Sequence, residues 1–348
     1  MTPPELAFPG PGAPGNAPST RRSLDPRSYM PQNKWFKVAA PIALPLLIWL
    51  FLPVFGISQP DVLVRATPFI LTALAVALPA RAGLINVGGE GQLLIGAAAA
   101  GGFAFVVEDA LPMVVMLPAI VAVGALGGLL WSGIAAVLKN FFNVNETIST
   151  LLLNYVAALL LGFLVNDALK DPESFGFAIA PEVSDSARLP HFGDSQVHVG
   201  LLIAIAMTFV IWTLIERSRW GFRAKVVGGN PEAARRGGIP VGKTVMTALL
   251  LGGAIAGLAG VVELSGTEIR VRSDMASGFG YIGFLCSWMV GHRTAWIPSA
   301  AVLLAGISVY GDNLQIDYGL PASTVYILMA AIVLLVLAQR PRTPKAAN

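Results

Sequence analysis

The chain has 348 residues, of which 55% are hydrophobic and only 12% are charged, and its formal net charge is +3. Soluble proteins carry about 25% charged residues. This shortage of charge, with the apolar residues gathered in long runs, excludes a disordered chain, a nucleic-acid-binding domain and a disulfide scaffold. A single cysteine cannot form an intramolecular bridge, and three histidines leave little for a metal site. Since a helix of about 20 apolar residues crosses a bilayer, the composition predicts an all-α polytopic membrane protein.

The chain begins with a polar tail, continues as ten apolar segments and closes with a second tail. Residues 1–37 are rich in Pro, Gly, Ser and Arg and hold no apolar run, so we expect disorder there. Residues 38–338 form the predicted transmembrane domain, and 339–348 the closing tail. The eighth and ninth segments are short for full crossings and rich in glycine. The ten predicted helices are 38–55, 62–80, 91–107, 112–138, 146–166, 198–215, 244–263, 278–291, 296–310 and 320–338.

The distribution of charge predicts which side of the membrane each loop occupies. Basic residues flank the first and last segments, so both termini are expected to be cytoplasmic. The loop 216–243 holds seven basic residues and is predicted to be cytoplasmic too. The loop 167–197 holds six acidic and two basic residues, which predicts an external position. Five spans before that loop, one after it and four more satisfy all of these constraints.

The two halves of the domain share a pattern. Residues 62–166 and 244–338 each contain four predicted spans, and the two sets run in opposite directions. In both, the second helix opens on a glycine-rich stretch, after Asn86 in the first set and after Ser277 in the second. Interrupted helices at corresponding places of two oppositely oriented halves are typical of transporters. We therefore expect two inverted repeats.

A first polar stretch, residues 82–96, leads into the third predicted helix. It places Asn86, Glu90 and Gln92 among several glycines. Irregular backbone at membrane depth is tolerated only where protein or a water-filled cavity surrounds it. An ionisable residue at such a position indicates a functional site. The alternative is a cytoplasmic turn in which Glu90 stabilises a helix N-terminus.

A second polar stretch, residues 142–160, opens the fifth predicted helix. Asn145 followed by Glu146 resembles an N-cap with an acidic first turn. Asn154 lies about two turns further along, where its amide needs a hydrogen-bond partner. It either bonds a neighbouring helix or lines a solute pathway.

The cytoplasmic loop contains the signature of one short helix. Asn230 stands as its cap, Pro231 at its first position and Gly237 just past its end. Arg235 and Arg236 in the last turn suit the helix dipole. Such a helix is either a solvated loop element or a docking element for a partner.

The same loop contains a pattern that resembles a nucleotide-binding P-loop. Residues 237–244 read GGIPVGKT, which matches Gly, four residues, Gly-Lys-Thr. A working P-loop follows a buried strand in an α/β domain, whereas here a polar helix precedes it and a membrane segment follows. We therefore expect no nucleotide site in this chain.

Two further charges fall at the outer ends of predicted spans. Arg65 lies one turn into the second segment, and Glu263 ends the seventh. Both are expected to extend to the membrane surface, Glu263 with a loop residue as partner.

Four stretches carry a resemblance to a known family: Gly83–Ala97, Val144–Tyr155, Gly229–Ile239 and Gly252–Gly266. In these stretches, and in their order across residues 60–338, the chain resembles the permease subunits of ABC importers of the branched-chain amino acid and ribose permease superfamily. It is most like the nucleoside and simple-sugar permeases.

The resemblance implies a pore-forming subunit in the bacterial inner membrane that imports a small polar solute by alternating access. A nucleoside or nucleobase is the first expected solute, and a simple sugar the second. The implied partners are a second homologous permease, a cytoplasmic ABC ATPase that holds ATP and Mg, an extracytoplasmic substrate-binding protein and membrane lipid. The chain itself is then not an enzyme and holds no cofactor or metal.

The resemblance and the polar stretches together define two sets of candidate site residues. The predicted pathway residues are Asn86, Glu90, Gln92, Asn145, Glu146 and Asn154. The predicted ATPase-coupling residues are Asn230, Pro231, Glu232, Ala233, Ala234, Arg235 and Arg236. The alternatives are a secondary transporter, with Glu90 or Glu146 coupled to protons, and a passive solute channel.

Overall fold

The computed structural model describes residues 34–107, 110–174, 179–275, 278–319, 321 and 323–338. Most of the predicted tail 1–37 and all of the tail 339–348 lie outside the described residues. The helix α1 (Lys34–Phe51) begins in an N-terminal unit that ends at Ala39, and the chain from Ala40 onward forms one compact unit.

The described chain is mainly helical, which confirms the predicted class. The further α-helices are α2 (Gln59–Ala80), α3 (Gly89–Val107), α4 (Met113–Phe142), α5 (Glu146–Asn166), α6 (Gly200–Arg217), α7 (Arg219–Gly229), α8 (Pro231–Arg236), α9 (Val241–Glu263), α10 (Phe279–Met289), α11 (Ile297–Tyr318) and α12 (Ser323–Ala338). The shorter helical segments are η2 (Leu52–Phe55), η4 (Asp185–Ala187), the π-helical η5 (Leu264–Glu268) and η6 (Thr294–Trp296). Two short strands, β1 (Ile179–Glu182) and β2 (Arg270–Arg272), pair antiparallel, a small sheet that the sequence did not predict.

Seven of the described helices are long and apolar enough to cross a membrane, and α1, α10 and α12 contain shorter apolar stretches. The 11 residues of α10 span about 16 Å, roughly half of the ~30 Å hydrocarbon core. This helix therefore does not cross a bilayer by itself. The ninth segment is longer than predicted, since α11 continues to Tyr318. Its acidic Asp312 pairs with Arg65 of α2, which stabilises this charge within the longer helix.

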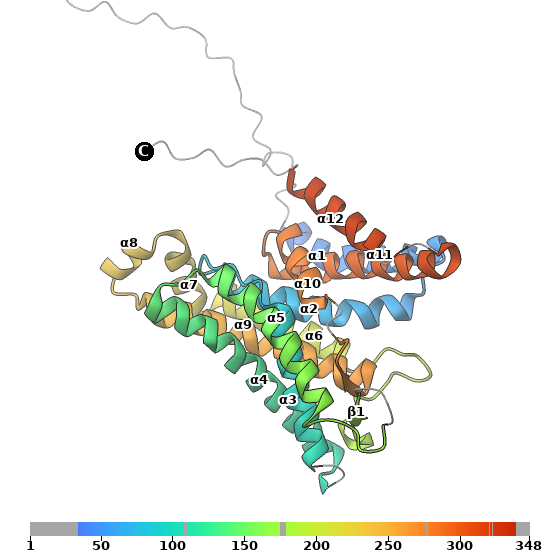
Figure 1. The fold of residues 1–348 in the computed structure, drawn as a ribbon. Helices are drawn as coiled ribbons and strands as arrows, with labels where there is room; N and C mark the ends of the chain where they lie inside the picture. The colour runs from blue at the N-terminus through green and yellow to red at the C-terminus, as the bar shows by residue number, and fades with distance from the viewer. Residues whose placement is uncertain are drawn as a thin grey trace, which may run out of the picture. The chain divides into compact units, whose positions relative to one another are not determined.

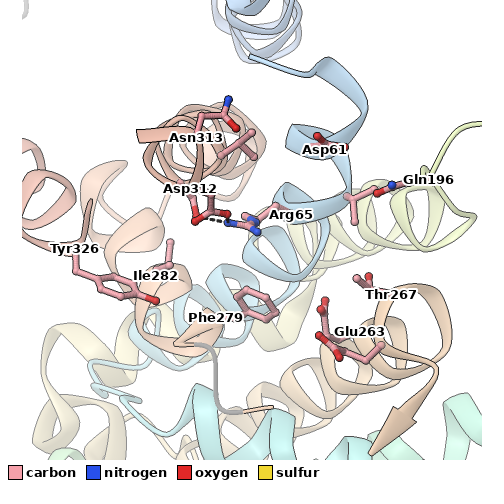
Figure 2. A pocket seen from close by; sticks show the side chains of 14 residues that line it. Asp61, Arg65, Gln196, Glu263, Thr267, Phe279, Ile282, Asp312, Asn313 and Tyr326 are labelled. Atoms are coloured by element: carbon pink, nitrogen blue, oxygen red, sulfur yellow. Dashed lines mark hydrogen bonds and ion pairs between the residues drawn. The ribbon is translucent and has the colours of Figure 1, made fainter. Parts of the chain in front are cut away.

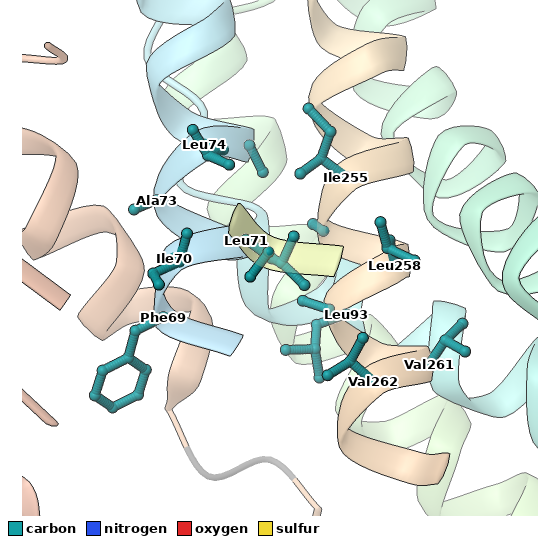
Figure 3. Packing of buried hydrophobic residues seen from close by; sticks show 14 of the residues in the cluster. Phe69, Ile70, Leu71, Ala73, Leu74, Leu93, Ile255, Leu258, Val261 and Val262 are labelled. Atoms are coloured by element: carbon teal, nitrogen blue, oxygen red, sulfur yellow. The ribbon is translucent and has the colours of Figure 1, made fainter. Parts of the chain in front are cut away.

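The helices α2 and α9 form the centre of the bundle. Every residue of α2 from Ala66 to Pro79 is buried, as expected of a helix that is apolar all round. Figure 3 shows Leu71 and Leu74 of α2 on the side of α9, while Phe69 points the other way. On its remaining sides α9 packs against α3 and α4.

Glycines allow α4 and α9 to approach very closely. A Cβ atom added to Gly257 of α9 would lie 3.0 Å from the Cα atom of Gly128 in α4, and Gly124 and Gly253 belong to the same contact. Small residues at helix contacts are typical of membrane proteins, where close packing replaces the hydrophobic effect as the attraction between helices.

Figure 1 shows α7 and α8 at one end of the bundle and β1 at the other. This agrees with the prediction that the loops 216–243 and 167–197 face opposite sides of the membrane. The cytoplasmic loop was predicted to hold one helix, but α7 precedes α8 and has its own cap. The hydroxyl of Ser218 accepts a hydrogen bond from the backbone N–H of Gly221 at 3.0 Å.

Candidate functional site

The helices α3 and α10 both begin deep inside the bundle, beside the middle of α2. The segment between α2 and α3 runs back along α2, so that the amide of Asn86 donates to the carbonyl of Ala75 at 3.4 Å. Asn86 also exchanges two hydrogen bonds of 3.1 Å with Gln92 in α3. At the start of α10, the carbonyl of Phe279 accepts a hydrogen bond from the hydroxyl of Thr72 at 3.1 Å. The N-termini of α3 and α10 therefore lie at a similar depth.

Glu90 joins these two N-termini. It lies in the first turn of α3 and is only 3% exposed. One carboxylate oxygen accepts from the backbone N–H of Gly278 at 2.9 Å, and the other from Gly280 at 2.6 Å. Because a helix N-terminus carries a partial positive charge, one carboxylate stabilises the beginnings of both helices.

Asn154 of α5 also contacts the beginnings of α3 and α10, and we call this meeting of the three helices, with Glu90, the junction. Its side-chain oxygen accepts from the backbone N–H of Gly91 at 2.9 Å. Its amide group donates to the carbonyl of Val87 at 2.9 Å and to the hydroxyl of Tyr281 at 3.2 Å. Asn154 thus connects α5 with the openings of both α3 and α10, and its polar groups are satisfied by protein.

At the start of α5 the predicted cap is confirmed. The side-chain oxygen of Asn145 accepts from the backbone N–H groups of Thr147 at 2.9 Å and Ile148 at 3.3 Å. Glu146 follows and forms a 2.8 Å ion pair with Lys139 at the end of α4. These contacts fix the turn between α4 and α5.

An outer cavity of about 450 Å³ lies at the end of α2 that carries Asp61 and Arg65. Its walls come from α2, α9, η5, α10, α11, α12 and the loop before α6. Figure 2 shows Arg65 between the acidic residues of this cavity. Arg65 donates to Asp312 at 2.5 Å and to the hydroxyl of Ser308 at 2.8 Å, so its guanidinium group is held in place.

An inner cavity of about 650 Å³ lies at the opposite end of α2. It is lined by Arg81 and Arg293, by the acidic Glu216 and by the indoles of Trp212 and Trp296. Arg81 and Glu216 form an ion pair of 3.0 Å. The outer cavity is thus mainly acidic, and the inner one mainly basic.

Between the two cavities lies a packed segment that we call the barrier, formed by Ala66–Val76 of α2 together with α10. All of Ala66–Val76 is buried. The first residue of α10, Phe279, lines the outer cavity, and Gly291, just beyond its end, lines the inner one. Both helices of the barrier, α2 and α10, therefore extend from one cavity to the other.

The linings of the outer and inner cavities do not include the predicted pathway residues. The structure places these residues at helix contacts instead, and their role in the pathway stays a prediction. They are Asn86, Glu90, Gln92, Asn145, Glu146 and Asn154.

The sequence did not single out the outer cavity as a site. Its charged residues stand at the outer ends of three predicted spans, and that shared position is the signal that could have grouped them. The expectation that Glu263 extends to the surface is wrong, because it is only 4% exposed and lines this cavity. Arg65 forms an ion pair with Asp312.

The predicted short cytoplasmic helix is present as α8. The side-chain oxygen of Asn230 accepts from the backbone N–H groups of Glu232 and Ala233, each at 3.0 Å. Within α8 only Ala234 is buried, so almost the whole helix is exposed. The P-loop-like stretch that follows joins α8 directly to α9 and follows no strand, as the sequence predicted.

The model of the family described as the permease component of the branched-chain amino acid transport system matches residues 60–337. The chain belongs to this family. This confirms the resemblance drawn from the four sequence stretches. The protein is a multi-pass membrane permease, a transport component and not an enzyme, and an ABC permease of this kind implies an ABC ATPase and a substrate-binding protein as partners.

Similar proteins come from archaea and bacteria. The chain is 36% identical over 293 residues to the glucose ABC transporter permease protein TsgB13 of Haloferax volcanii, covering 81% of this chain and 76% of the relative. It is 34% identical over 275 residues to the guanosine ABC transporter permease protein NupP of Bacillus subtilis, covering 78% of each. It is 28% identical over 280 residues to the nucleoside ABC transporter permease protein NupB of Lactococcus lactis, covering 76% and 75%.

Proposed function

We propose that this permease is the pore-forming subunit of an ATP-driven importer for a nucleoside, nucleobase or simple sugar. The names of its relatives, which refer to glucose, guanosine and nucleosides, support this range of solutes. The observation that carries the proposal is the pair of cavities at opposite ends of α2, separated by the barrier.

In this proposal transport proceeds by alternating access. The outer cavity receives the solute, the barrier opens, and the inner cavity releases the solute to the cytoplasm. Helices that begin at membrane depth are common at the solute sites of transporters, and α3 and α10 begin in this way. The junction at Glu90 then links the first half of the chain to the helix that must move.

The partners lie in the inner membrane and on both of its faces, and the ATPase among them supplies the energy. A second homologous permease completes the pore, and an extracytoplasmic binding protein delivers the solute. A cytoplasmic ABC ATPase, which holds ATP and Mg, contacts α8. Both termini of this chain are cytoplasmic. The side chains of Arg235 and Arg236 are 66% and 81% exposed, which suits a helix that inserts into a groove of a partner.

The proposal is tested by reversing charge on α8. The double variant Arg235→Glu, Arg236→Glu is expected to insert into the membrane but to lose co-purification with the ATPase and ATP-dependent uptake. The control is Arg223→Glu, which reverses an exposed cytoplasmic charge on α7 and should retain both. Proton-driven uptake by this chain alone in liposomes would overturn the proposal in favour of a secondary transporter.

A further inference from the structure

The outer cavity contains a buried carboxylate that forms no hydrogen bond with any residue that the structure describes. Glu263, the last residue of α9, is 4% exposed, and among the described residues it has neither a hydrogen bond nor an ion pair. Its charged neighbours are Glu268 and, across the cavity, Arg65. A buried carboxylate without donors is costly, so its presence in a cavity wall points to a ligand that supplies them.

The backbone beside Glu263 is irregular in a way that is frequent at functional sites. The helix α9 passes at Glu263 into the π-helical segment η5, and such π-turns occur often where ligands bind. The residue that follows the segment is Ile269, which has φ of 53°. For a β-branched residue this left-handed conformation is strained. The strain lies directly after Thr267 and Glu268, both of which line the cavity.

The wall opposite Glu263 is rigid and partly aromatic. Arg65 is fixed by Asp312 and Ser308. The ring of Phe279 packs edge-to-face on Phe69, with centroids 5.6 Å apart. Figure 2 shows Arg65, Phe279 and Glu263 around the same space, with the ring of Tyr326 on the far side. Pockets that combine aromatic walls with a few fixed polar groups are typical of sites for small organic ligands.

We propose that Glu263 recognises the solute by accepting hydrogen bonds from two adjacent hydroxyl groups, those of a ribose or a simple sugar, while Phe279 contacts the apolar face of the ligand. This assignment rests on the proposed function. The two oxygens of a carboxylate can accept from two neighbouring donors at once. The cavity is mainly acidic, and the oxygens of ionised carboxylates only accept hydrogen bonds, which suits a ligand rich in hydroxyl donors.

The test compares each solute with the analogue that lacks one of the two hydroxyls. The complete transporter, with both permeases, the ATPase and the binding protein, is reconstituted in proteoliposomes. Uptake is measured for guanosine against 2′-deoxyguanosine and for glucose against 2-deoxyglucose, and the pair that the wild type imports is then used. Because every variant works with the same binding protein, the preference of that protein cancels when variants are compared.

In Glu263→Gln we expect the uptake of the hydroxyl-bearing solute, relative to that of the deoxy solute, to fall about tenfold to hundredfold. This is the change in affinity that corresponds to the loss of one hydrogen bond to a charged group. The charge-matched control is Asp61→Asn at the edge of the cavity, which should affect both solutes alike and leave the ratio unchanged. A melting temperature of Glu263→Gln close to that of the wild type ensures that the variant is folded.

Two results overturn the inference while leaving the proposed function in place. One is an unchanged ratio in Glu263→Gln, and the other is an equal loss of both solutes, which would assign Glu263 to the charge of the cavity. If the wild-type complex hydrolyses ATP but imports neither pair, the proposed range of solutes fails first, and the inference fails with it.

Discussion

Replacing Glu90 by alanine removes the carboxylate that joins the N-termini of α3 and α10. The two backbone N–H groups that it accepts from, those of Gly278 and Gly280, are then left without a partner. Because this junction lies in the interior, water is not at hand to replace the carboxylate. We therefore expect Glu90→Ala to destabilise the permease.

The size of the effect follows from the two hydrogen bonds. A hydrogen bond to a charged group contributes about 1.5–3 kcal/mol, which gives roughly 3–6 kcal/mol for two as an upper range. Hydrogen bonds between helices in membrane proteins average only about 0.6 kcal/mol, which lowers the expectation. We predict a loss of about 2–4 kcal/mol for Glu90→Ala and about half of that for Glu90→Gln, which keeps one acceptor oxygen.

The assay is thermal unfolding of the purified permease in detergent. At about 2 °C per kcal/mol, Glu90→Ala should lower the melting temperature by about 4–8 °C. The control is Glu232→Gln, since this side chain is 59% exposed and surface ion pairs contribute about 0–1 kcal/mol. A melting temperature of Glu90→Ala within 1 °C of the wild type refutes the role of Glu90 in joining the two helices.

Three further predictions concern helix packing, the contacts of Asn154 and the β1–β2 sheet. Gly257→Val places side-chain atoms against α4 and should destabilise the fold by about 1–3 kcal/mol or more. The control is Gly162→Val, which should leave the melting temperature unchanged because no atom lies within 4 Å of a Cβ added at Gly162. Asn154→Leu should reduce both the melting temperature and uptake but not the association with the ATPase, because α8 is untouched. A hydrogen bond from Arg270 holds the pKa of Glu182 below its usual range, so this carboxylate stabilises the β1–β2 sheet above the ordinary glutamate pKa of about 4.3. That contribution is lost as the pH falls through the lowered pKa, and amide exchange in β1, corrected for its intrinsic pH dependence, should then accelerate in the wild type but not in Glu182→Gln.

The helices and their caps were readable from the sequence because their signals are local. Asn230 and Pro231 at the start of α8, and Gly237 at its end, predicted that helix at its observed bounds. Asn145 did the same for the start of α5. Each of these residues acts on N–H groups or backbone angles within a few positions, so no knowledge of the tertiary structure was needed.

The depth at which α3 and α10 begin could not be predicted in the same way. It depends on the segment before α3 running back along α2, and on contacts such as that between Asn86 and Ala75. For Asn154 the sequence left two alternatives open, a pathway residue or a link between helices. Its three partners belong to α10 and to the segment from Val87 to Gly91, so only the packing of three segments shows what it contacts.

The outer cavity could not be predicted from the sequence either, because it too depends on how distant segments pack. Arg65 and Asp312 are 247 positions apart, and Glu263 lies between them in sequence. A charged residue at the end of a predicted span indicates only that this residue lies near the membrane surface. That these ends converge on one cavity depends on how α2, α9 and α11 pack together.

The short barrier also has an electrical consequence. Where water fills both cavities, the membrane potential falls mainly across the barrier, whose helix α10 is about 16 Å long, rather than across the whole bilayer. A monovalent ion that passed from one cavity to the other would gain or lose nearly the full 2.3 kcal/mol or so per 100 mV. A neutral solute crosses the same field at no electrical cost, so the uptake of a nucleoside or sugar through this chain should proceed at the same rate whether the membrane is polarised or not.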